Sequence, residues 1–359
     1  MITLSTYPAA PTTDSDQKGP LIAAIDLGTN SCRLLVARAE NKVFRIVDAY
    51  SKVVRLGEGI VKSGVLSQEA MDRAYEALSI CRDKILDHRV VKFRAVTTEA
   101  CRLASNSQDF LDRIEKDLKL KLEIIPQQEE ARLALSGCSG IMDNRFPFAI
   151  AFDIGGGSTE VMWIRLKNRS YSPFKEQWTL PYRSLDDFDV IDWISIPFGV
   201  VTNSEQDNMS KSFQSVYREV RQDVHNALFD FSRRNRIPRW IFRRKVQMVG
   251  TSGTVTTLAA IQHNLERYDR RFIDGMYLSF RDIRSVSHTV RNMSIQERLE
   301  HPCIGPGRSE LVIIGIAILE GICDVWRLNR LRVADRGVRE GILIDLLQEI
   351  DNDTKLYTS

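Results

Sequence analysis

The sequence lacks the cysteine pattern of a disulfide scaffold or a zinc site. Its six cysteines include no pair at CxxC spacing, and a chain of 359 residues can bury an ample core without cross-links. We therefore expect reduced, mostly buried thiols in a reducing compartment. None of the five histidines stands in a recognised motif, so no histidine is assigned a role.

Segments that would enter or cross a membrane are also missing. The longest apolar stretches fall well short of the roughly 18 residues that a membrane span requires. The first twenty residues are polar and rich in proline, serine and threonine, without the basic start and apolar run of a secretory signal. We predict a disordered leader over residues 1–20 and a cytoplasmic protein with no membrane partner.

The chain also has no large excess of positive or negative charge. The formal net charge is +3, with 27% charged residues, so the overall balance does not predict a nucleic-acid partner. A polyanionic substrate would have to be held by local basic groups. Residues 231–245 carry seven basic side chains, which slightly favours a polyanion, although a solvated basic face is our preferred interpretation.

Apolar runs and helical spacing predict an α/β chain of about two domains. Strands are predicted over residues 21–26, 33–38, 43–48, 93–97, 122–125, 148–154, 160–164, 246–250 and 331–334. Helices are predicted after an N-cap at Ser67 and over residues 108–118, 128–138, 209–236, 254–264, 310–326 and 339–350. Residues 165–192 are interpreted as a long hairpin or a surface insertion.

An internal duplication is the most informative feature of the chain. The segments AAIDLGTNSCRLLVA and AFDIGGGSTEVMWI both consist of an apolar strand, an aspartate, a glycine-containing polar loop and a second apolar strand. Asp26 and Asp153 are the equivalent acids, 127 residues apart. The repeat predicts two similar α/β halves, each with one Asp–Gly hairpin.

Three small polar loops carry the donors that a phosphate requires. Glycines allow the backbone to approach a ligand, and successive N–H groups form an anion nest. The third loop lies between a strand and a helix, where a helix N-terminus attracts anions. The candidate phosphate-binding residues are Gly28, Thr29, Asn30 and Ser31 in the first loop, Gly155, Gly156, Gly157, Ser158 and Thr159 in the second, and Gly250, Thr251, Ser252 and Gly253 in the third.

Acidic residues beside these loops are candidate metal ligands. No GxGxxG fingerprint and no Walker lysine are present, which argues against dinucleotide and P-loop chemistry. Phosphoryl transfer needs a metal and, for hydrolysis, an oriented water. Asp153 and Glu160 flank the second loop and could share one Mg²⁺, which Asp26 could reach through water.

A general base and a phosphate-holding arginine can be suggested only weakly from spacing. Glu129 and Glu130 begin a predicted helix at a domain junction, where either carboxylate could act as a base. Charged helix starts are common, however, and spacing alone does not single out one of them. Arg102 could bind a non-transferred phosphate with its two-pronged guanidinium, but a surface arginine would explain it equally well.

At this point the chain is seen to resemble the exopolyphosphatase and guanosine pentaphosphate phosphohydrolase (Ppx/GppA) family, within the actin-like superfold. The matching segments are AAIDLGTNSCRLLVA, TTEACRLASN, EIIPQQEEARLALSGC, AFDIGGGSTEVMWI, SIPFGV, MVGTSGTVTTLAAI and VADRGVREGIL. They occur in family order over about residues 21–345. DIGGGSTE together with the upstream EEAR is highly specific.

The resemblance implies two duplicated actin-like (ribonuclease H-like) domains with a cleft between them. The first would comprise residues 21–138 plus a returning helix within 339–355, and the second residues 139–338. The resemblance implies that Glu130 is the catalytic base, that Asp153 and Glu160 are the Mg²⁺-associated acids, and that Arg102 and the glycine loops bind phosphate. A homodimer is expected from the family.

The implied activity is release of terminal orthophosphate from inorganic polyphosphate by attack of water. Release of the 5′-γ-phosphate of guanosine pentaphosphate is an alternative. A non-catalytic polyphosphate or alarmone sensor and an ATP-dependent kinase of the same superfold are alternatives of other classes. Two departures from the family are visible: Pro126 stands where serine is usual, and the chain lacks the extra C-terminal helical domains of longer exopolyphosphatases, which puts strong processivity in doubt.

Overall fold

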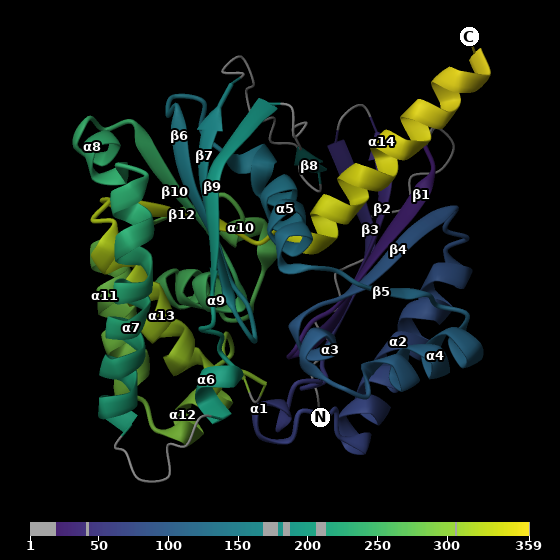
Figure 1. Ribbon diagram of the computed structural model, residues 1–359, viewed down its shortest axis with the longest axis horizontal. Helices are drawn as coiled ribbons and strands as arrows, with labels where there is room; N and C mark the ends of the chain where they lie inside the picture. The colour runs from purple at the N-terminus through teal and green to yellow at the C-terminus, as the bar shows by residue number, and fades with distance from the viewer. Residues whose placement is uncertain are drawn as a thin grey trace. The chain divides into compact units, whose positions relative to one another are not determined.

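The computed structural model describes residues 19–40, 43–167, 179–181, 187–205, 213–305 and 307–358. These residues divide into two compact units (Figure 1). The first unit contains the described residues up to Gly140, the short segment 179–181 and the residues from Gly337 onwards, and the second contains the remainder. Apart from Gly19 and Pro20, the predicted leader lies outside the described residues.

The first unit is built on a six-stranded sheet of order β5-β4-β1-β2-β3-β8. Antiparallel pairs join β1 to β2, β2 to β3 and β3 to β8, whereas β1 and β4, and β4 and β5, are parallel. The strands are β1 (Leu21–Leu27), β2 (Ser31–Glu40), β3 (Val43–Val53), β4 (Lys92–Thr97), β5 (Leu122–Ile124) and β8 (Thr179–Pro181). The helices are α1 (Ile60–Ser63), α2 (Gln68–Asp87), α3 (Glu99–Leu103), α4 (Ser107–Leu118), α5 (Gln127–Cys138) and α14 (Val338–Thr358).

The second unit has a six-stranded sheet of order β11-β12-β10-β6-β7-β9. Its strands are β6 (Phe148–Ile154), β7 (Thr159–Leu166), β9 (Phe188–Ile196), β10 (Val246–Thr251), β11 (Tyr277–Ser279) and β12 (Arg330–Ala334). Its helices are α6 (Thr202–Glu205), α7 (Phe213–Arg234), α8 (Ile237–Phe242), α9 (Gly253–Gln262), α10 (Arg270–Ile273), α11 (Phe280–Asn292), α12 (Ile295–Glu300) and α13 (Leu311–Val325). A 3-10 turn, η1 (Ser139–Ile141), links the two units along the chain.

The predicted duplication is confirmed strand by strand. In each unit an antiparallel meander, β1-β2-β3 or β6-β7-β9, is extended on the side of its first strand by two parallel strands, β4-β5 or β10-β12. The predicted α/β class with two duplicated halves of the actin-like kind is therefore confirmed. The cleft between the halves stays a prediction.

Strands β8 and β9 were not predicted from the sequence. Segment 179–181 pairs with β3 and so belongs to the first unit, although the sequence placed it within a continuous second domain of residues 139–338. Strand β9 covers the end of the stretch interpreted as an insertion, and the rest of that stretch lies mostly outside the described residues. Each of these strands forms by pairing with another strand, β8 with β3 and β9 with β7. The intrinsic β-propensity of a segment does not reveal such pairing.

Strand β1 is apolar except for Asp26 because both faces of its sheet are covered. Ala23, Ile25 and Leu27 pack into one hydrophobic cluster with α2 and α4, while Ile22 and Ala24 pack into another with α5 and α14. Figure 1 shows α14 across one face of the strands and α2 with α4 on the opposite face. A continuous apolar run rather than an alternating one is expected of a strand buried on both sides.

Helices α5 and α14 cross at close range, and glycine makes this possible. A Cβ atom on Gly341 would lie 2.1 Å from the carbonyl oxygen of Leu133, and one on Gly137 would lie 2.1 Å from the carbonyl oxygen of Gly337. No side chain can occupy such positions without displacing the partner helix. The contact fixes the N-terminal half of α14 and the body of α5 in the first unit.

Candidate active site

The first glycine loop joins β1 to β2 and is fixed by backbone hydrogen bonds. The Gly28 amide donates to the Ser31 carbonyl at 3.0 Å, and the Thr29 and Asn30 carbonyls accept from residues that follow β3. A Cβ on Gly57 would lie only 2.3 Å from the Thr29 methyl group, so the covering segment touches the loop directly. The Thr29 and Asn30 amides have no acceptor within the described part of the chain, as an anion nest requires.

The second glycine loop joins β6 to β7 with the same construction. The Gly155 amide donates to the Ser158 carbonyl at 2.9 Å, as Gly28 does to Ser31 in the first loop. Among the described residues, nothing accepts from the amides of Gly156, Gly157 and Ser158. Equivalent loops therefore present N–H groups that are free to bind phosphate oxygens in each unit.

Residues 195–202, which begin with SIPFGV, hold the second loop through hydrogen bonds to its carbonyl groups. The amides of Val200 and Val201 donate to the carbonyls of Gly155 and Gly156 at 3.1 and 2.8 Å, and the Thr202 hydroxyl donates to the Gly157 carbonyl at 3.0 Å. Because the carbonyl groups of the second loop are bonded to residues 200–202, its amide groups remain available to a ligand. A Cβ on Gly199 would lie 2.3 Å from the Gly156 oxygen, so only glycine fits there.

The third loop follows β10 and caps α9. The Ser252 hydroxyl accepts from the Val255 amide at 3.1 Å, and the Thr251 hydroxyl donates to the Arg336 carbonyl at 2.5 Å. In the parallel ladder Thr251 is the register partner of Asp153. The second and third loops thus leave neighbouring strands at one edge of the sheet, where the parallel pairing brings their polar groups together.

Arg308 was not anticipated as a site residue. Its guanidinium lies beside the third loop, with a carbon that would be 3.3 Å from a Cβ on Gly253, and it donates to the Thr257 hydroxyl at 3.0 Å. The sequence PGRSE gave no periodic or motif signal for this role. Only folding of the chain brings residue 308 beside residue 253.

Asp153 and Glu160 are register partners across the β6–β7 hairpin, as their spacing predicted. Glu160 is buried, with 2% of its surface exposed, and its Oε1 atom accepts from the Ser158 hydroxyl at 2.5 Å and from the Ser195 hydroxyl at 2.9 Å. A buried carboxylate needs such donors to replace the hydrogen bonds that water would otherwise supply. The two hydroxyls orient Glu160 from the start of β7 and the end of β9.

This pair of acids suits magnesium better than a metal that demands a complete protein cage. Mg²⁺ usually keeps several waters and takes one or two carboxylates together with substrate phosphates. Within the described residues no cluster of three or more histidine, cysteine or acidic side chains is arranged for a metal. Asp153 and Glu160 are brought together, whereas Asp26 belongs to the other unit.

Asp26 occupies the position in the first unit that Asp153 occupies in the second, but its cross-strand partner is Arg33 rather than an acid. Burial raises the pKa of Asp26, while the charges of Arg33 and Arg339 oppose that rise and the charge of Glu340 adds to it. Residues 339 and 340 lie at the start of α14. This helix was predicted from the sequence, but Arg339 and Glu340 were not among the predicted site residues.

Glu130 lies in the first turn of α5 and pairs with Arg102 of α3. The distance from Arg102 Nη2 to Glu130 Oε2 is 2.9 Å, and each side chain is 16% exposed. Arg102 also donates to Glu99 Oε2 and to the Ile125 carbonyl, at 2.6 and 2.7 Å. Burial acts to lower the pKa of the Arg102 guanidinium, but the charges of Glu130 and Glu99 outweigh it and raise this pKa.

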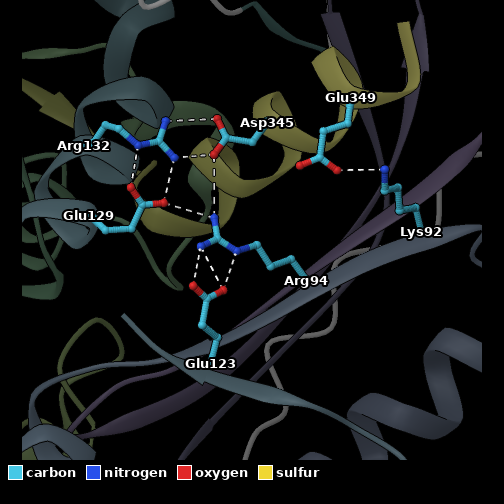
Figure 2. Close-up of polar contacts among 7 residues, drawn as sticks. All are labelled: Lys92, Arg94, Glu123, Glu129, Arg132, Asp345 and Glu349. Atoms are coloured by element: carbon cyan, nitrogen blue, oxygen red, sulfur yellow. Dashed lines mark hydrogen bonds and ion pairs between the residues drawn. The ribbon is translucent and has the colours of Figure 1, made fainter. Parts of the chain in front are cut away.

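Glu129, unlike Glu130, contacts Arg132 and Arg94 (Figure 2). Both of its oxygens accept from Arg132, at 2.6 and 2.8 Å, and Oε1 also accepts from Arg94 at 3.1 Å. Arg132 continues to Asp345 of α14, and Arg94 continues to Glu123 of β5. Glu129 therefore joins α5 to α14 and β5, whereas Glu130 contacts α3, so the structure gives different partners to two glutamates that residue spacing alone did not distinguish.

The repeated sheets and glycine loops define a duplicated α/β protein of the actin-like (ribonuclease H-like) class. The chain belongs to the Ppx/GppA phosphatase family, whose model matches residues 35–350. The resemblance stated from the sequence is thereby confirmed.

Similar proteins of known description agree with this membership. A putative exopolyphosphatase of Haemophilus influenzae is 26% identical over 329 residues, covering 90% of this chain and 91% of the relative. Exopolyphosphatase 2 of Mycobacterium tuberculosis is 26% identical over 343 residues, covering 90% and 98%. A bifunctional 3-dehydroquinate synthase/phosphatase of Fusobacterium nucleatum is 28% identical, and the chain spans about half of its length, 46%.

Solved structures share the fold. An exopolyphosphatase-like protein superposes with a TM-score of 0.75 at 28% identity, and an exopolyphosphatase from Cytophaga hutchinsonii with 0.74 at 25%; each match covers 92% of this chain and 98% of the other. A Ppx/GppA protein of Aquifex aeolicus, at 23% identity and a TM-score of 0.67, supports the fold alone. Within the described residues, no helix is long and apolar enough to cross a bilayer.

Proposed function

We propose that this chain is an exopolyphosphatase that releases terminal orthophosphate from inorganic polyphosphate. The observation that carries the proposal is the placement of Glu130, a partly buried carboxylate held by Arg102 in the first turn of α5. A non-catalytic sensor has no need of a positioned base. The exopolyphosphatase names of two relatives matched over 91% and 98% of their lengths favour polyphosphate as the substrate class.

In the proposed reaction, Glu130 takes a proton from the attacking water. The water oxygen forms a bond to the terminal phosphorus as the bridging P–O bond breaks, which yields orthophosphate and a chain one phosphate shorter. The free amides of the glycine loops donate to the phosphate oxygens, where negative charge spreads in the transition state. Arg102 holds the Glu130 carboxylate and supplies a cation for a phosphate of the substrate.

Asp153 and Glu160 are the residues that we propose to hold Mg²⁺. At these residues Mg²⁺ would supply neutralisation of charge on the phosphate oxygens and would help to orient them. The Ser158 and Ser195 hydroxyls fix one Glu160 oxygen, which limits the ways in which this carboxylate can turn. Asp26 is proposed to contribute only through water, since burial raises its pKa and it faces Arg33.

The test is phosphate release from long polyphosphate, short polyphosphate and guanosine pentaphosphate, each with Mg²⁺ and with EDTA. We expect Mg²⁺-dependent release that is fastest on polyphosphate, and a loss of at least about 10²-fold in kcat for Glu130→Gln with little change in substrate binding. Glu129→Gln is the matched control. Near-normal turnover of the Glu130 variant would remove this residue from the role.

The same measurement separates the alternatives. Faster release from guanosine pentaphosphate would make the alarmone the preferred substrate. Tight polyphosphate binding without any release would indicate a sensor, and phosphate transfer from ATP to an acceptor would indicate a kinase. Cytoplasmic location and a homodimer remain proposals, and size-exclusion chromatography with light scattering tests the latter.

A further inference from the structure

A basic corner of the second unit is not used by the proposed reaction. It comprises the end of α7, helix α8 and the residues up to β10, and its exposed cations are Arg233, Arg236, Arg239, Arg243, Arg244 and Lys245. The stretch 231–245 contains no acidic residue. None of these six cations forms an ion pair within the described part of the chain, so their charge is directed to solvent.

Asp192, an acid that contacts this corner, is already paired. Asp192 Oδ2 accepts from Arg234 Nε at 2.7 Å and from Asn235 Nδ2 at 2.6 Å. The Arg234 guanidinium also lies over the Phe231 ring. Arg234 therefore attaches the end of α7 to β9 of the sheet. The remaining six cations take no part in these contacts with Asp192.

Phe242 protrudes from the middle of these cations. Its side chain is 91% exposed at the end of α8. Trp240, two residues earlier, is held differently: its ring lies 4.5 Å from the Phe148 ring, and the guanidinium groups of Arg239 and Arg243 lie 5.9 and 5.7 Å from its centre. One apolar ring is therefore free to enter a partner, while its aromatic neighbour anchors the helix.

Backbone strain accompanies this arrangement. Arg236 and Arg244 have φ angles of 53° and 55°, in the left-handed region that glycine and asparagine enter more readily. These two residues bracket α8, between the end of α7 and the start of β10. Arginine at both strained positions places charge where a less costly residue would serve a turn alone.

The basic corner lies at the opposite end of β10 from the glycine loops. Lys245 precedes the strand, and Thr251, which opens the third loop, ends it. At about 3.3 Å per residue the strand separates these two residues by roughly 20 Å. Figure 1 shows α8 beside one end of β6 and β10, whereas α9, which follows the third loop, lies at the other end.

We propose that this corner is a docking surface for an anionic lipid bilayer, bound peripherally. Clustered lysine and arginine residues attract anionic headgroups, and a phenylalanine among them enters the interfacial region. Inorganic polyphosphate offers nothing apolar for Phe242. Single-stranded nucleic acid is bound by several stacking rings along a groove, and here Trp240 is already occupied. The sequence predicted no membrane partner because no span is present, but peripheral docking needs no span.

The experiment is flotation of the full chain with vesicles of phosphatidylcholine alone and with phosphatidylglycerol at a third of the lipid. We expect binding only to the anionic vesicles, and a marked decrease at high salt because the charges are exposed. Arg239→Ala/Arg243→Ala/Lys245→Ala should weaken the partition coefficient by about 100-fold, and Phe242→Ser by about 10-fold. Phosphate release from short polyphosphate should be unchanged in both.

The matched control is Lys116→Ala/Lys121→Ala/Arg281→Ala, which removes three exposed cations elsewhere. An equal loss of vesicle binding in this control would overturn the proposal, because net charge rather than the corner would then be responsible. Binding to neutral vesicles as strong as to anionic ones would overturn it too. So would binding of single-stranded RNA or polyphosphate through this corner without vesicle binding. Circular dichroism melts show that each variant is folded.

Discussion

Arg102 Nη2 lies 2.9 Å from Glu130 Oε2 and 2.6 Å from Glu99 Oε2, so one nitrogen joins the first turn of α5 to the first turn of α3. A second nitrogen of the same guanidinium reaches the Ile125 carbonyl at 2.7 Å. The planar fork of arginine satisfies these directions at once, and a lysine ammonium does not reproduce that geometry. This contact places the proposed base.

We expect Arg102→Lys to retain the fold and lose about 10- to 100-fold in kcat with polyphosphate. The charge remains, but the Glu130 carboxylate is no longer held in one orientation. Steady-state kinetics across a range of polyphosphate concentrations measures kcat and KM separately. A change in KM alone would instead assign Arg102 to substrate binding.

The Glu129 network is expected to support stability more than catalysis. Glu129→Gln should lower the free energy of unfolding by about 1–3 kcal/mol, because the neighbouring guanidinium groups of Arg132 and Arg94 lose a partly buried charged acceptor. Chemical denaturation at pH 7 measures this. Activity at 25 °C should stay within a few-fold of the wild type, in contrast to Glu130→Gln.

The stability difference between wild type and Glu129→Gln should depend on pH in a definite direction. Hydrogen bonds from Arg132, aided by Arg94 and opposed by burial, lower the pKa of the Glu129 carboxyl. A carboxyl with a lowered folded-state pKa stabilises the fold above its unfolded-state pKa of about 4.3, and this stabilisation is lost as pH falls through the lower folded-state value. Denaturation curves between pH 7 and pH 3 should therefore converge for the two proteins. A constant difference would contradict this account.

Gly199→Ala is expected to damage the second glycine loop. Its Cβ would lie 2.3 Å from the Gly156 oxygen, and overpacking of this kind typically costs about 1–3 kcal/mol. Thermal melting and phosphate release measure the two effects. Gly28→Ala is the contrasting variant, because its Cβ would meet nothing closer than 3.7 Å. It should melt near the wild-type temperature.

Ser195→Ala is expected to weaken the response to Mg²⁺. The Ser195 hydroxyl donates to Glu160 Oε1 at 2.9 Å, and loss of such a supporting group typically costs about 10- to 100-fold in metal affinity. Activity titrated against Mg²⁺ concentration measures the shift. The control is Ser204→Ala, whose hydroxyl donates to the Val201 carbonyl. Equal Mg²⁺ curves for the two variants would argue against Glu160 as a ligand.

Local elements were predictable where the sequence pattern is strong. Strand β6 was predicted with its observed bounds, 148–154, and Ser67 caps α2 by accepting from the Ala70 amide at 3.2 Å. Strands β9 and β11 were not predicted, because β9 mixes polar and apolar residues and β11 has three residues. Such strands form because a neighbouring strand supplies their hydrogen bonds.

The sequence by itself determined the duplication, the two Asp–Gly hairpins and the family, because these reside in runs of adjacent residues. Only the tertiary structure showed that Glu130 and Glu129 contact different arginines, that the Ser195 hydroxyl donates to Glu160 and that Arg308 lies beside Gly253. These relations join residues that are far apart in the chain, or adjacent residues that turn to different partners. They depend on strand register and helix crossing, which no local pattern encodes.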